Sequence, residues 1–284
     1  MGDPAAGERA GSGEQSAAGE RATAGGGTAV AGEPLLAVAD VSIAFGGVQA
    51  LAGVSLAVAA GEAVGLVGPN GAGKTTLFEC IGGRLRPDGG SVRFAGADLA
   101  GVPAHRRSRL GIARTFQRVE VFPELTPVEH VLVAARARQG GGMLWRDLVR
   151  RGTPRPDEVE QARALVGMVG LADAADVPVA ALGLGHTRLV ELARALASSP
   201  RLLLADEPSS GLDTTETAVI AALLRRIQRE RGVAVLLVEH DLALVRRAVD
   251  RVVVLDSGHV IADGPFALVV ADPAVRRAYL GRSA

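Results

Sequence analysis

The fold of this chain is decided by the stretch Gly68-Pro69-Asn70-Gly71-Ala72-Gly73-Lys74-Thr75. The stretch matches the pattern G-x-x-x-x-G-K-[S/T], a glycine-rich loop whose backbone N–H groups bind phosphates. Lys74 is the only lysine in the chain, and every other basic side chain except histidine is an arginine. The slim ammonium group of lysine fits where the planar fork of arginine does not. We therefore predict a nucleoside-triphosphate site in which Lys74 reaches the β- and γ-phosphates.

The residues on either side of this loop predict the context that the phosphate motif requires. The apolar run Ala63–Val67 predicts a buried strand before the loop, and Lys74–Ile81 predicts a helix after it. The N-terminus of such a helix adds partial positive charge, and the Thr75 hydroxyl group is expected to bind Mg²⁺. A tight glycine turn that only caps the helix is the alternative. The loop residues expected to bind the nucleotide are Gly68, Pro69, Asn70, Gly71, Ala72, Gly73, Lys74, Thr75 and Thr76.

Composition separates a tail from a folded domain. Residues 1–33 are mainly Gly, Ala, Ser, Thr and Glu, so they cannot bury enough apolar surface to offset the entropy cost of ordering. We predict a disordered tail at 1–33 and one folded domain at 34–284. The formal net charge of the whole chain is +0, which gives no global signal for nucleic-acid binding.

The sequence contains no segment that predicts passage through a membrane. No apolar run approaches the ~20 residues that a membrane-spanning helix needs. The first residues lack the charged-then-apolar pattern of a signal peptide, and the single cysteine fits a reducing compartment. These features predict a cytoplasmic protein whose membrane partner, if it has one, is another chain.

Apolar runs and helical segments alternate along much of the chain, which is typical of an α/β fold with a mostly parallel sheet covered by helices. The segment Leu35–Phe45 is expected to lead into a pair of strands. The further expected strands are Val54–Ala59, Ser91–Phe94, Leu202–Ala205, Val233–Val238 and Arg251–Leu255. The expected helices are Glu129–Ala137, Asp157–Val169, Thr187–Ala197, Thr214–Arg229 and Leu242–Val249.

Two adjacent acids follow the expected strand Leu202–Ala205. Asp206 would emerge beside the phosphates and hold the magnesium ion, directly or through water. Glu207 could orient or deprotonate the attacking water molecule. The alternative is that these acids only cap a helix, but the helix cap is expected at Asp213, with Glu216 three residues further on.

A histidine ends another apolar strand. His240 follows Val233–Glu239, and in open α/β sheets the carboxyl ends of the strands border the crevice where ligands bind. A lone histidine at such a place is more often structural. Together with the loop and the acids, however, it predicts a contact between His240 and the γ-phosphate.

Several of these stretches, in this order, resemble the ATP-binding subunits of ABC transporters. The matching stretches are Gly68–Thr76, Arg114–Gln117, Leu202–Pro208, Ser210–Asp213 and Val238–Asp241. The resemblance covers residues 34–284 and implies a P-loop NTPase (RecA-like) core with a mostly parallel sheet, an antiparallel β subdomain and an α-helical subdomain. The helical subdomain would span about 118–198, and C-terminal helices would span about 265–284.

The resemblance also implies roles for residues outside the loop. Gln117 would contact both the magnesium ion and the water where the core meets the helical subdomain, and Asp213 would lie in the loop that meets a partner subunit. Phe45 looks like the aromatic residue that stacks on adenine, which its flat apolar face suits. The alternative for Phe45 is a core aromatic. The catalytic residues would then be Lys74, Glu207 and His240.

A narrower resemblance is to the ATPases of branched-chain amino-acid importers, although urea, amide and other hydrophobic amino-acid importers share its motifs. The stretches that carry it are Phe45–Val48, Gly111–Gln117, Val121–Thr126 and Ala278–Gly281. It implies an ATPase that uses ATP and Mg²⁺ at the inner face of the cell membrane. Its partners would be a second ABC ATPase subunit, two transmembrane permease chains and, indirectly, an extracytoplasmic solute-binding protein, with no nucleic acid.

One stretch departs from the family pattern. Where the family has Leu-Ser-Gly-Gly-Gln, this chain has Leu182-Gly183-Leu184-Gly185-His186. Gly183 lacks the hydroxyl group that would bond the partner's γ-phosphate, and His186 replaces a glutamine amide. Because the resemblance places this stretch against the partner's nucleotide, we predict an asymmetric heterodimer with one stronger site.

Two other functions stay open at this point. One is a subunit that acts mainly as a regulatory partner, which the degenerate signature favours. The other is a soluble ABC ATPase acting on ribosomes or DNA, but the chain has one ATPase unit and no sustained heptads. The arginine-rich runs His105–Arg118 and Gln139–Arg155 are expected to be solvated faces. Contact with anionic lipids or with a membrane partner's loops is the alternative.

Overall fold

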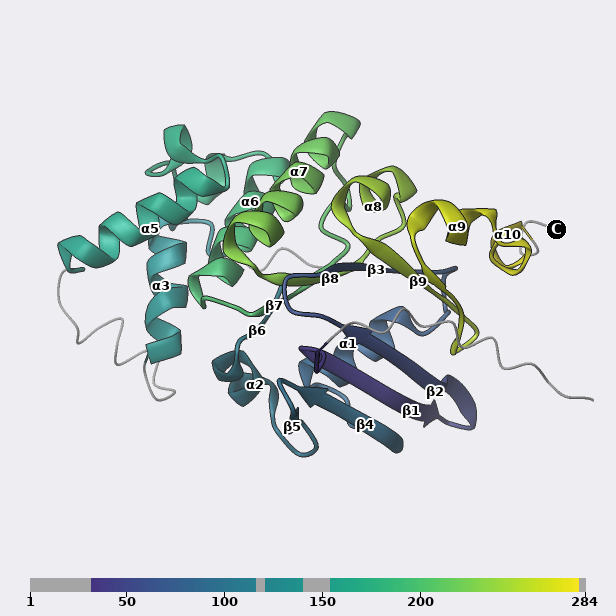
Figure 1. The fold of residues 1–284 in the computed structure, drawn as a ribbon. Coiled ribbons are helices and arrows are strands. Elements are labelled where there is room, and N and C mark those ends of the chain that lie inside the picture. Colours follow the sequence, from purple (N-terminus) through teal and green to yellow (C-terminus); the bar gives the residue numbers. More distant parts are fainter. Residues whose placement is uncertain (1–31, 116–120, 140–153, 281–284) are drawn as a thin grey trace, which may run out of the picture.

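The computed structural model describes residues 32–115, 121–139 and 154–280 (Figure 1). A six-stranded sheet lies at the centre, a four-stranded sheet lies below it in this view, and a group of helices lies together at one end. Within the described ranges no helix is long and apolar enough to span a bilayer. The tail predicted at 1–33 falls almost wholly outside these ranges, and the domain boundaries at 34–284 and 118–198 stay predictions.

The four-stranded sheet is antiparallel. It contains β1 (Leu36–Phe45), β2 (Val48–Val58), β4 (Gly89–Phe94) and β5 (Ala97–Asp98), in the order β2-β1-β4-β5. A two-residue turn at Gly46 and Gly47 joins β1 to β2, and both glycines have positive φ, 53° and 84°, which suits a tight hairpin. The second strand, expected from Val54, begins at Val48 because the chain reverses at this turn.

The six-stranded sheet has the order β10-β9-β3-β8-β7-β6. Its strands are β3 (Ala63–Val67), β6 (Ile112–Arg114), β7 (Leu202–Asp206), β8 (Ala234–Val238), β9 (Arg251–Asp256) and β10 (His259–Gly264). Only β9 and β10 pair antiparallel, so the predicted mostly parallel sheet is confirmed. Val238 pairs with both Leu66 and Asp206, so β3, β7 and β8 end at the same edge of the sheet.

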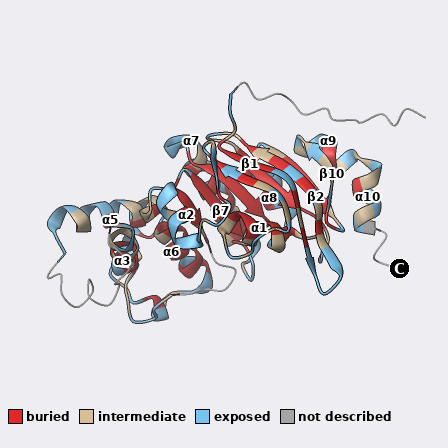
Figure 2. Cartoon of the chain, turned by 90° about the horizontal axis from the view of Figure 1, so that it is seen from below, coloured by how far each residue is buried: buried red, intermediate tan, exposed pale blue. Residues whose placement is uncertain are grey.

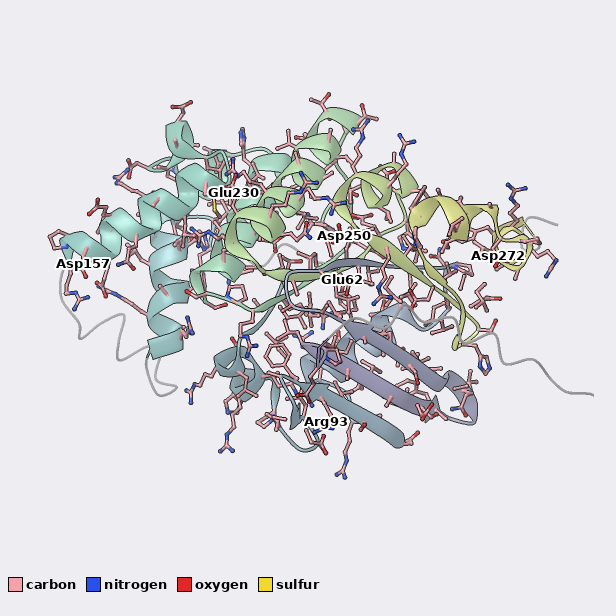
Figure 3. All side chains as sticks on the ribbon, viewed as in Figure 1. Glu62, Arg93, Asp157, Glu230, Asp250 and Asp272 are labelled. Atoms are coloured by element: carbon pink, nitrogen blue, oxygen red, sulfur yellow. The ribbon has the colours of Figure 1, made fainter. Side chains whose placement is uncertain are left out.

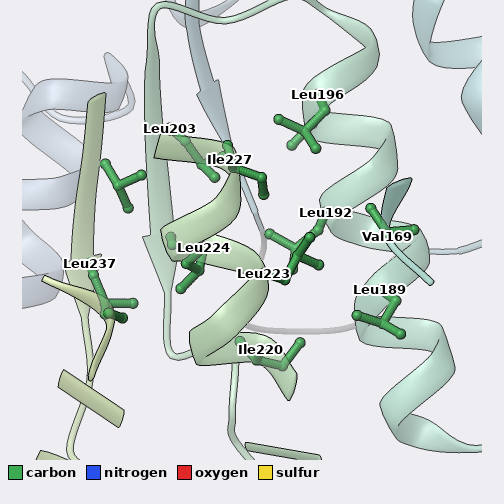
Figure 4. Packing of buried hydrophobic residues seen from close by; sticks show 14 of the residues in the cluster. Val169, Leu189, Leu192, Leu196, Leu203, Ile220, Leu223, Leu224, Ile227 and Leu237 are labelled. Carbon is green, nitrogen blue, oxygen red and sulfur yellow. The ribbon is translucent and has the colours of Figure 1, made fainter. Parts of the chain in front are cut away.

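Two apolar clusters fill the two faces of this sheet. Leu202 and Leu204 of β7 belong to one cluster and Leu203 to the other, because side chains alternate across a strand. The first cluster holds the antiparallel sheet and α1 (Lys74–Gly82) against one face. Strands β3, β7 and β8 are buried along their whole length, whereas β1 and β2 mix buried and more exposed residues (Figure 2). In the second cluster, α7 (Thr214–Arg231) packs between the sheet and a further helix (Figure 4).

The remaining helices lie around these layers. They are α2 (Ala104–Leu110), α3 (Pro127–Gln139), α5 (Pro156–Met168), α6 (Leu184–Ala197), α8 (Leu242–Ala248), α9 (Phe266–Ala271) and α10 (Pro273–Leu280), with 3-10 turns η1 (Ala172–Ala174) and η2 (Val179–Ala181). Helices α3, α5 and α6 pack on one another and form the group at one end (Figure 1). Charged side chains such as Arg93, Asp157 and Glu230 project from the outer surface (Figure 3).

The expectation that His105–Arg118 is a solvated face is wrong for Arg107. This side chain is only 6% exposed. Its guanidinium group donates hydrogen bonds to the carbonyl oxygens of Cys80 (2.7 Å), Ile81, Leu99 and Val102 (2.8 Å each). Positive charge is favourable at the C-terminal end of a helix, and two of these carbonyls belong to the last turn of α1. Arg107 therefore fixes α2 to the helix that follows the phosphate loop.

Candidate nucleotide-binding and catalytic site

The glycine loop between β3 and α1 has a backbone that only glycine allows at two positions. Gly68 has φ of 149°, and a Cβ atom there would lie 2.0 Å from the carbonyl oxygen of Leu255. Gly73 has φ of 105°, and a Cβ atom there would lie 2.6 Å from the carbonyl oxygen of Ala50. The loop is therefore held tightly between β9 and the start of β2, and the two motif glycines are required by this close approach.

Lys74 lies inside this loop rather than on the surface. The side chain is 6% exposed, and its Nζ donates hydrogen bonds to the carbonyl oxygens of Gly68 (2.7 Å) and Pro69 (3.0 Å). Burial lowers the pKa of Lys74 below its usual value, and the nearby carboxylate of Glu207 opposes this shift. The geometry thus holds a cation at the centre of the loop, where phosphate oxygens would be bound.

The N-terminus of α1 is suited to bind an anion. Gly73 is its N-cap and provides no side-chain hydrogen bond, so the N–H groups of the first turn lack a side-chain acceptor. The first turn contains no acidic residue, and Thr75 is exposed there. Positive dipole charge and available N–H groups at one helix end are the features that bind phosphate.

Glu207 and His240 meet across the ends of β7 and β8. Glu207 Oε1 lies 2.7 Å from His240 Nε2, and the side chains are 17% and 46% exposed. The N–H of Glu207 donates to the carbonyl of Val238 (2.9 Å), which places the first residue after β7 beside the end of β8. Glu207 has φ of 46°, a left-handed conformation that is costly for glutamate and is typical of functional sites. The two predicted catalytic side chains are therefore in direct contact.

Asp206 has a partner that the sequence did not reveal. Its side chain is 2% exposed, and Oδ2 lies 2.7 Å from a guanidinium nitrogen of Arg114. Another nitrogen of Arg114 lies 2.8 Å from Glu79 Oε1 on α1, and the backbone N–H of Asp206 donates to the Thr115 hydroxyl group (3.2 Å). Arg114 occurs in the stretch that carries the family resemblance, but only the fold brings it between two carboxylates. It fixes one oxygen of the expected magnesium ligand.

The oxygen donors near the loop fit a magnesium ion that takes most of its ligands from phosphate and water. The expected protein donors are the exposed Thr75 hydroxyl group and the Asp206 carboxylate, and Mg²⁺ prefers such oxygen ligands. In the described ranges no group of three or more His, Cys, Asp or Glu side chains could hold a metal ion by itself. A metal that depends on the nucleotide for its other ligands is consistent with this donor set.

The structure tests the exposure of Phe45 but not the position of Gln117. Phe45 ends β1 and is 48% exposed, so the alternative that it is a core aromatic is wrong. Its flat face is available to a ring, and its role against adenine stays a prediction. Gln117 lies outside the described residues, so its predicted contacts with the metal and the nucleotide stay predictions as well.

The stretch that departs from the family signature begins α6. Gly183 is the N-cap of this helix, and Gly183, Leu184 and His186 are exposed. A Cβ atom at Gly185 would lie 2.3 Å from a carboxylate oxygen of Glu216 on α7. The start of α6 is therefore packed closely against the start of α7.

The predicted helix cap at Asp213 is confirmed. Its Oδ1 accepts hydrogen bonds from the backbone N–H groups of Thr215 (2.7 Å) and Glu216 (2.8 Å), and the Glu216 side chain accepts one from the Asp213 N–H (3.1 Å). This capping box fixes the loop between β7 and α7, which starts at the site residue Glu207.

A phosphate loop beside an acidic strand end and a histidine, on a mostly parallel sheet, defines a P-loop ATPase. Residues 51–210 match the family model described as ABC transporter, and residues 259–284 match the model described as branched-chain amino acid ATP-binding cassette transporter. The chain therefore belongs to the ABC transporter family, as a member that contains the ATP-binding cassette.

Known relatives and solved structures agree with this assignment. The chain is 38% identical over 254 residues to the high-affinity branched-chain amino acid transport ATP-binding protein BraF of Pseudomonas aeruginosa, covering 88% of this chain and 99% of that protein. It is similar to the ADP conformation of MJ1267, an ATP-binding cassette of an ABC transporter (TM-score 0.78, 30% identity, 88% of this chain, 100% of that chain). It is also similar to MJ0796 in a dimeric post-hydrolysis state bound to ADP and Pi (TM-score 0.68, 26% identity, 81% of this chain, 98% of that chain).

Proposed function

We propose that this chain is the ATP-hydrolysing subunit of an importer for branched-chain or other hydrophobic amino acids. The observation that carries the hydrolytic part is the 2.7 Å contact between Glu207 and His240 at the same sheet edge as the loop that holds the Lys74 ammonium group. The substrate class is supported by the name of BraF and by the C-terminal match at residues 259–284.

Each residue has a distinct task in this proposal. The loop residues Gly68 to Thr76 bind the triphosphate through backbone N–H groups, and Lys74 stabilises charge on the β- and γ-phosphates. Glu207 takes the proton of the attacking water, and His240 contacts the γ-phosphate while it bonds Glu207. Thr75, Asp206 and Gln117 would hold Mg²⁺, which would offset the negative charge of the phosphate oxygens.

The proposed partners, a permease chain and a second ATPase subunit, are suggested by the family and by one cavity. A cavity of about 390 Å³ lies between α1, α2, β6, α3 and α6, and its lining includes Ala113, Ala134, Ala195 and Arg194. We infer that a cytoplasmic segment of a permease chain contacts the protein here, because the lining combines small side chains, which allow close approach, with charged ones such as Arg84 and Arg194. A second ATPase subunit would complete the nucleotide sites, in line with the dimeric form of MJ0796. In this proposal the chain works at the inner face of the cell membrane, bound to the permease chains.

The transport function is tested by uptake into membrane vesicles that contain the two permease chains, both ATPase subunits and the solute-binding protein. We expect leucine, isoleucine and valine to accumulate only when ATP is present on the side of the ATPase subunits. Accumulation of none of these amino acids, with ATP still hydrolysed, would reject the substrate class and leave the ATPase in place.

A mainly regulatory subunit remains the second candidate, and the exposed Gly183 is the observation that favours it. Gly183 has φ of −69°, and a Cβ atom there would have no heavy atom within 4 Å, so serine fits without strain. We expect Gly183→Ser to raise the turnover of the assembled complex several-fold, because a hydroxyl group then reaches the partner's γ-phosphate. Serine is also a better N-cap than glycine by a few tenths of a kcal/mol, so the stability of the variant must be measured alongside.

The matched control is Gly183→Ala, which adds the Cβ atom without the hydroxyl group. Steady-state phosphate release from the complex should rise for serine and not for alanine. Equal turnover in all three forms would show that the signature departure does not limit the partner's site.

A further inference from the structure

Glu239, the residue between β8 and His240, is a buried carboxylate with several donors. The residue is only 3% exposed. Oε1 accepts hydrogen bonds from the backbone N–H (2.9 Å) and the hydroxyl group (2.7 Å) of Ser209. Oε2 accepts a hydrogen bond from the backbone N–H of His240 (3.1 Å). Removing a carboxylate from water is costly, and these three donors offset part of that cost.

The donors come from the two loops that carry the catalytic pair. Ser209 follows Glu207 by two residues in the loop after β7, and His240 begins the loop after β8. Because Glu239 directly precedes His240, its Oε1 ties the loop after β7 to the start of the loop after β8, and its Oε2 fixes the chain direction at His240. The contact of 2.7 Å between Glu207 and His240 is a second link between the same two loops. The hydrogen bond from the Glu207 N–H to the Val238 carbonyl joins the two loops where the strands end. The carboxylate of Glu239 joins them one to two residues further along.

We propose that Glu239 is a positioning residue that holds the Glu207 carboxylate against the His240 imidazole. The inference rests on the proposed ATPase function and adds to it a residue that touches neither the nucleotide nor the water. Loss of any of these bonds lets His240 shift relative to Glu207, and a displacement of about 1 Å at reacting groups can cost up to about 10²-fold in rate. Binding of ATP depends on the glycine loop and is not expected to change.

Glutamine is the most informative substitution for Glu239, because it keeps the shape of the side chain and replaces one carboxylate oxygen with an NH₂ group. The amide oxygen can still accept from the N–H and hydroxyl groups of Ser209, which are two donors. The amide NH₂ group then faces the N–H of His240, and two donors cannot bond each other. Glu239→Gln therefore loses the hydrogen bond to the His240 N–H and turns the chain at His240, while it keeps the bonds to Ser209. Ser209→Ala removes one of the two bonds on the other side.

The test compares the full chain with its partner subunits in wild-type, E239Q and S209A forms. We expect E239Q to lower kcat about tenfold or more, with the KM for ATP and the calorimetric Kd for ATP unchanged. S209A is expected to lower kcat by a smaller factor. The ¹⁵N signals of the His240 ring should shift in E239Q, because the imidazole loses its contact with Glu207. Glu158→Gln is the control. It removes the charge from a 2.6 Å ion pair between α5 and α3, with Arg136, which is separate from the catalytic loops, and it should leave kcat unchanged.

The possible results separate this role from the proposed function. Wild-type kcat and unshifted His240 signals in E239Q would overturn the positioning role, and so would a parallel loss of ATP affinity, which indicates general disruption. If E239Q does not fold, S209A decides by the same criteria. If wild-type protein hydrolyses no ATP, the proposed function fails, and the His240 signals still decide whether Glu239 positions the ring.

Discussion

Glu207→Gln is expected to reduce ATP hydrolysis by about 10²–10⁴-fold while the protein still binds ATP. The carboxylate can accept a proton from water, and the carboxamide cannot. Glutamine has nearly the same shape as glutamate. The left-handed backbone at this position, with φ of 46°, costs both residues a similar conformational free energy, so the substitution does not disturb the loop. Phosphate release measures the loss of turnover, and calorimetry measures the retained affinity for ATP.

The control for this variant is Glu160→Gln, on the exposed surface of α5. It removes one carboxylate of the same type and should hydrolyse ATP at the wild-type rate. Wild-type turnover in E207Q would mean that another group accepts the proton. The assignment of Glu207 as the base would then be wrong, even though its contact with His240 exists.

Arg107→Met is expected to destabilise the protein by about 3 kcal/mol, which lowers Tm by roughly 8 °C. Methionine fills similar space but removes the guanidinium hydrogen bonds to the buried carbonyls of Cys80, Ile81 and Leu99 and to the part-buried carbonyl of Val102. It also removes the positive charge at the C-terminal end of α1. Urea unfolding followed by circular dichroism measures the free energy of unfolding.

Arg106→Met is the matched control, because Arg106 is the adjacent residue of α2 and is exposed. It removes an arginine of the same helix and should change the free energy of unfolding by less than about 0.5 kcal/mol. Equal effects of the two substitutions would mean that charge on α2, rather than the buried hydrogen bonds, accounts for the stability.

The parts of the fold that could be predicted are those in which local sequence and tertiary position agree. The apolar runs at Ala63–Val67, Leu202–Ala205 and Val233–Val238 are long enough to be buried strands, and they became β3, β7 and β8 with small changes at their ends. The cap at Asp213 could be predicted because a capping box is a local pattern. The rule that parallel strands end at one edge implied that Glu207 and His240 border the same crevice. Their direct contact was not predicted.

The missed features depend on contacts between distant residues. The three-residue strand β6 is stabilised by pairing with β7, and its own sequence lies inside an arginine-rich run. Arg107 is buried and Arg114 is largely covered, because each binds carbonyl or carboxylate groups of other elements, which their neighbours in sequence do not indicate. Glu239 was treated as part of a motif, and only the fold shows that Ser209 bonds it.

The most direct test of the whole account is phosphate release from ATP by the full chain together with its partner subunits. The account predicts saturable hydrolysis that requires Mg²⁺ and is lost in Lys74→Ala, whose loop lacks the buried ammonium group. Wild-type protein that neither binds ATP at millimolar concentrations nor releases phosphate would contradict it.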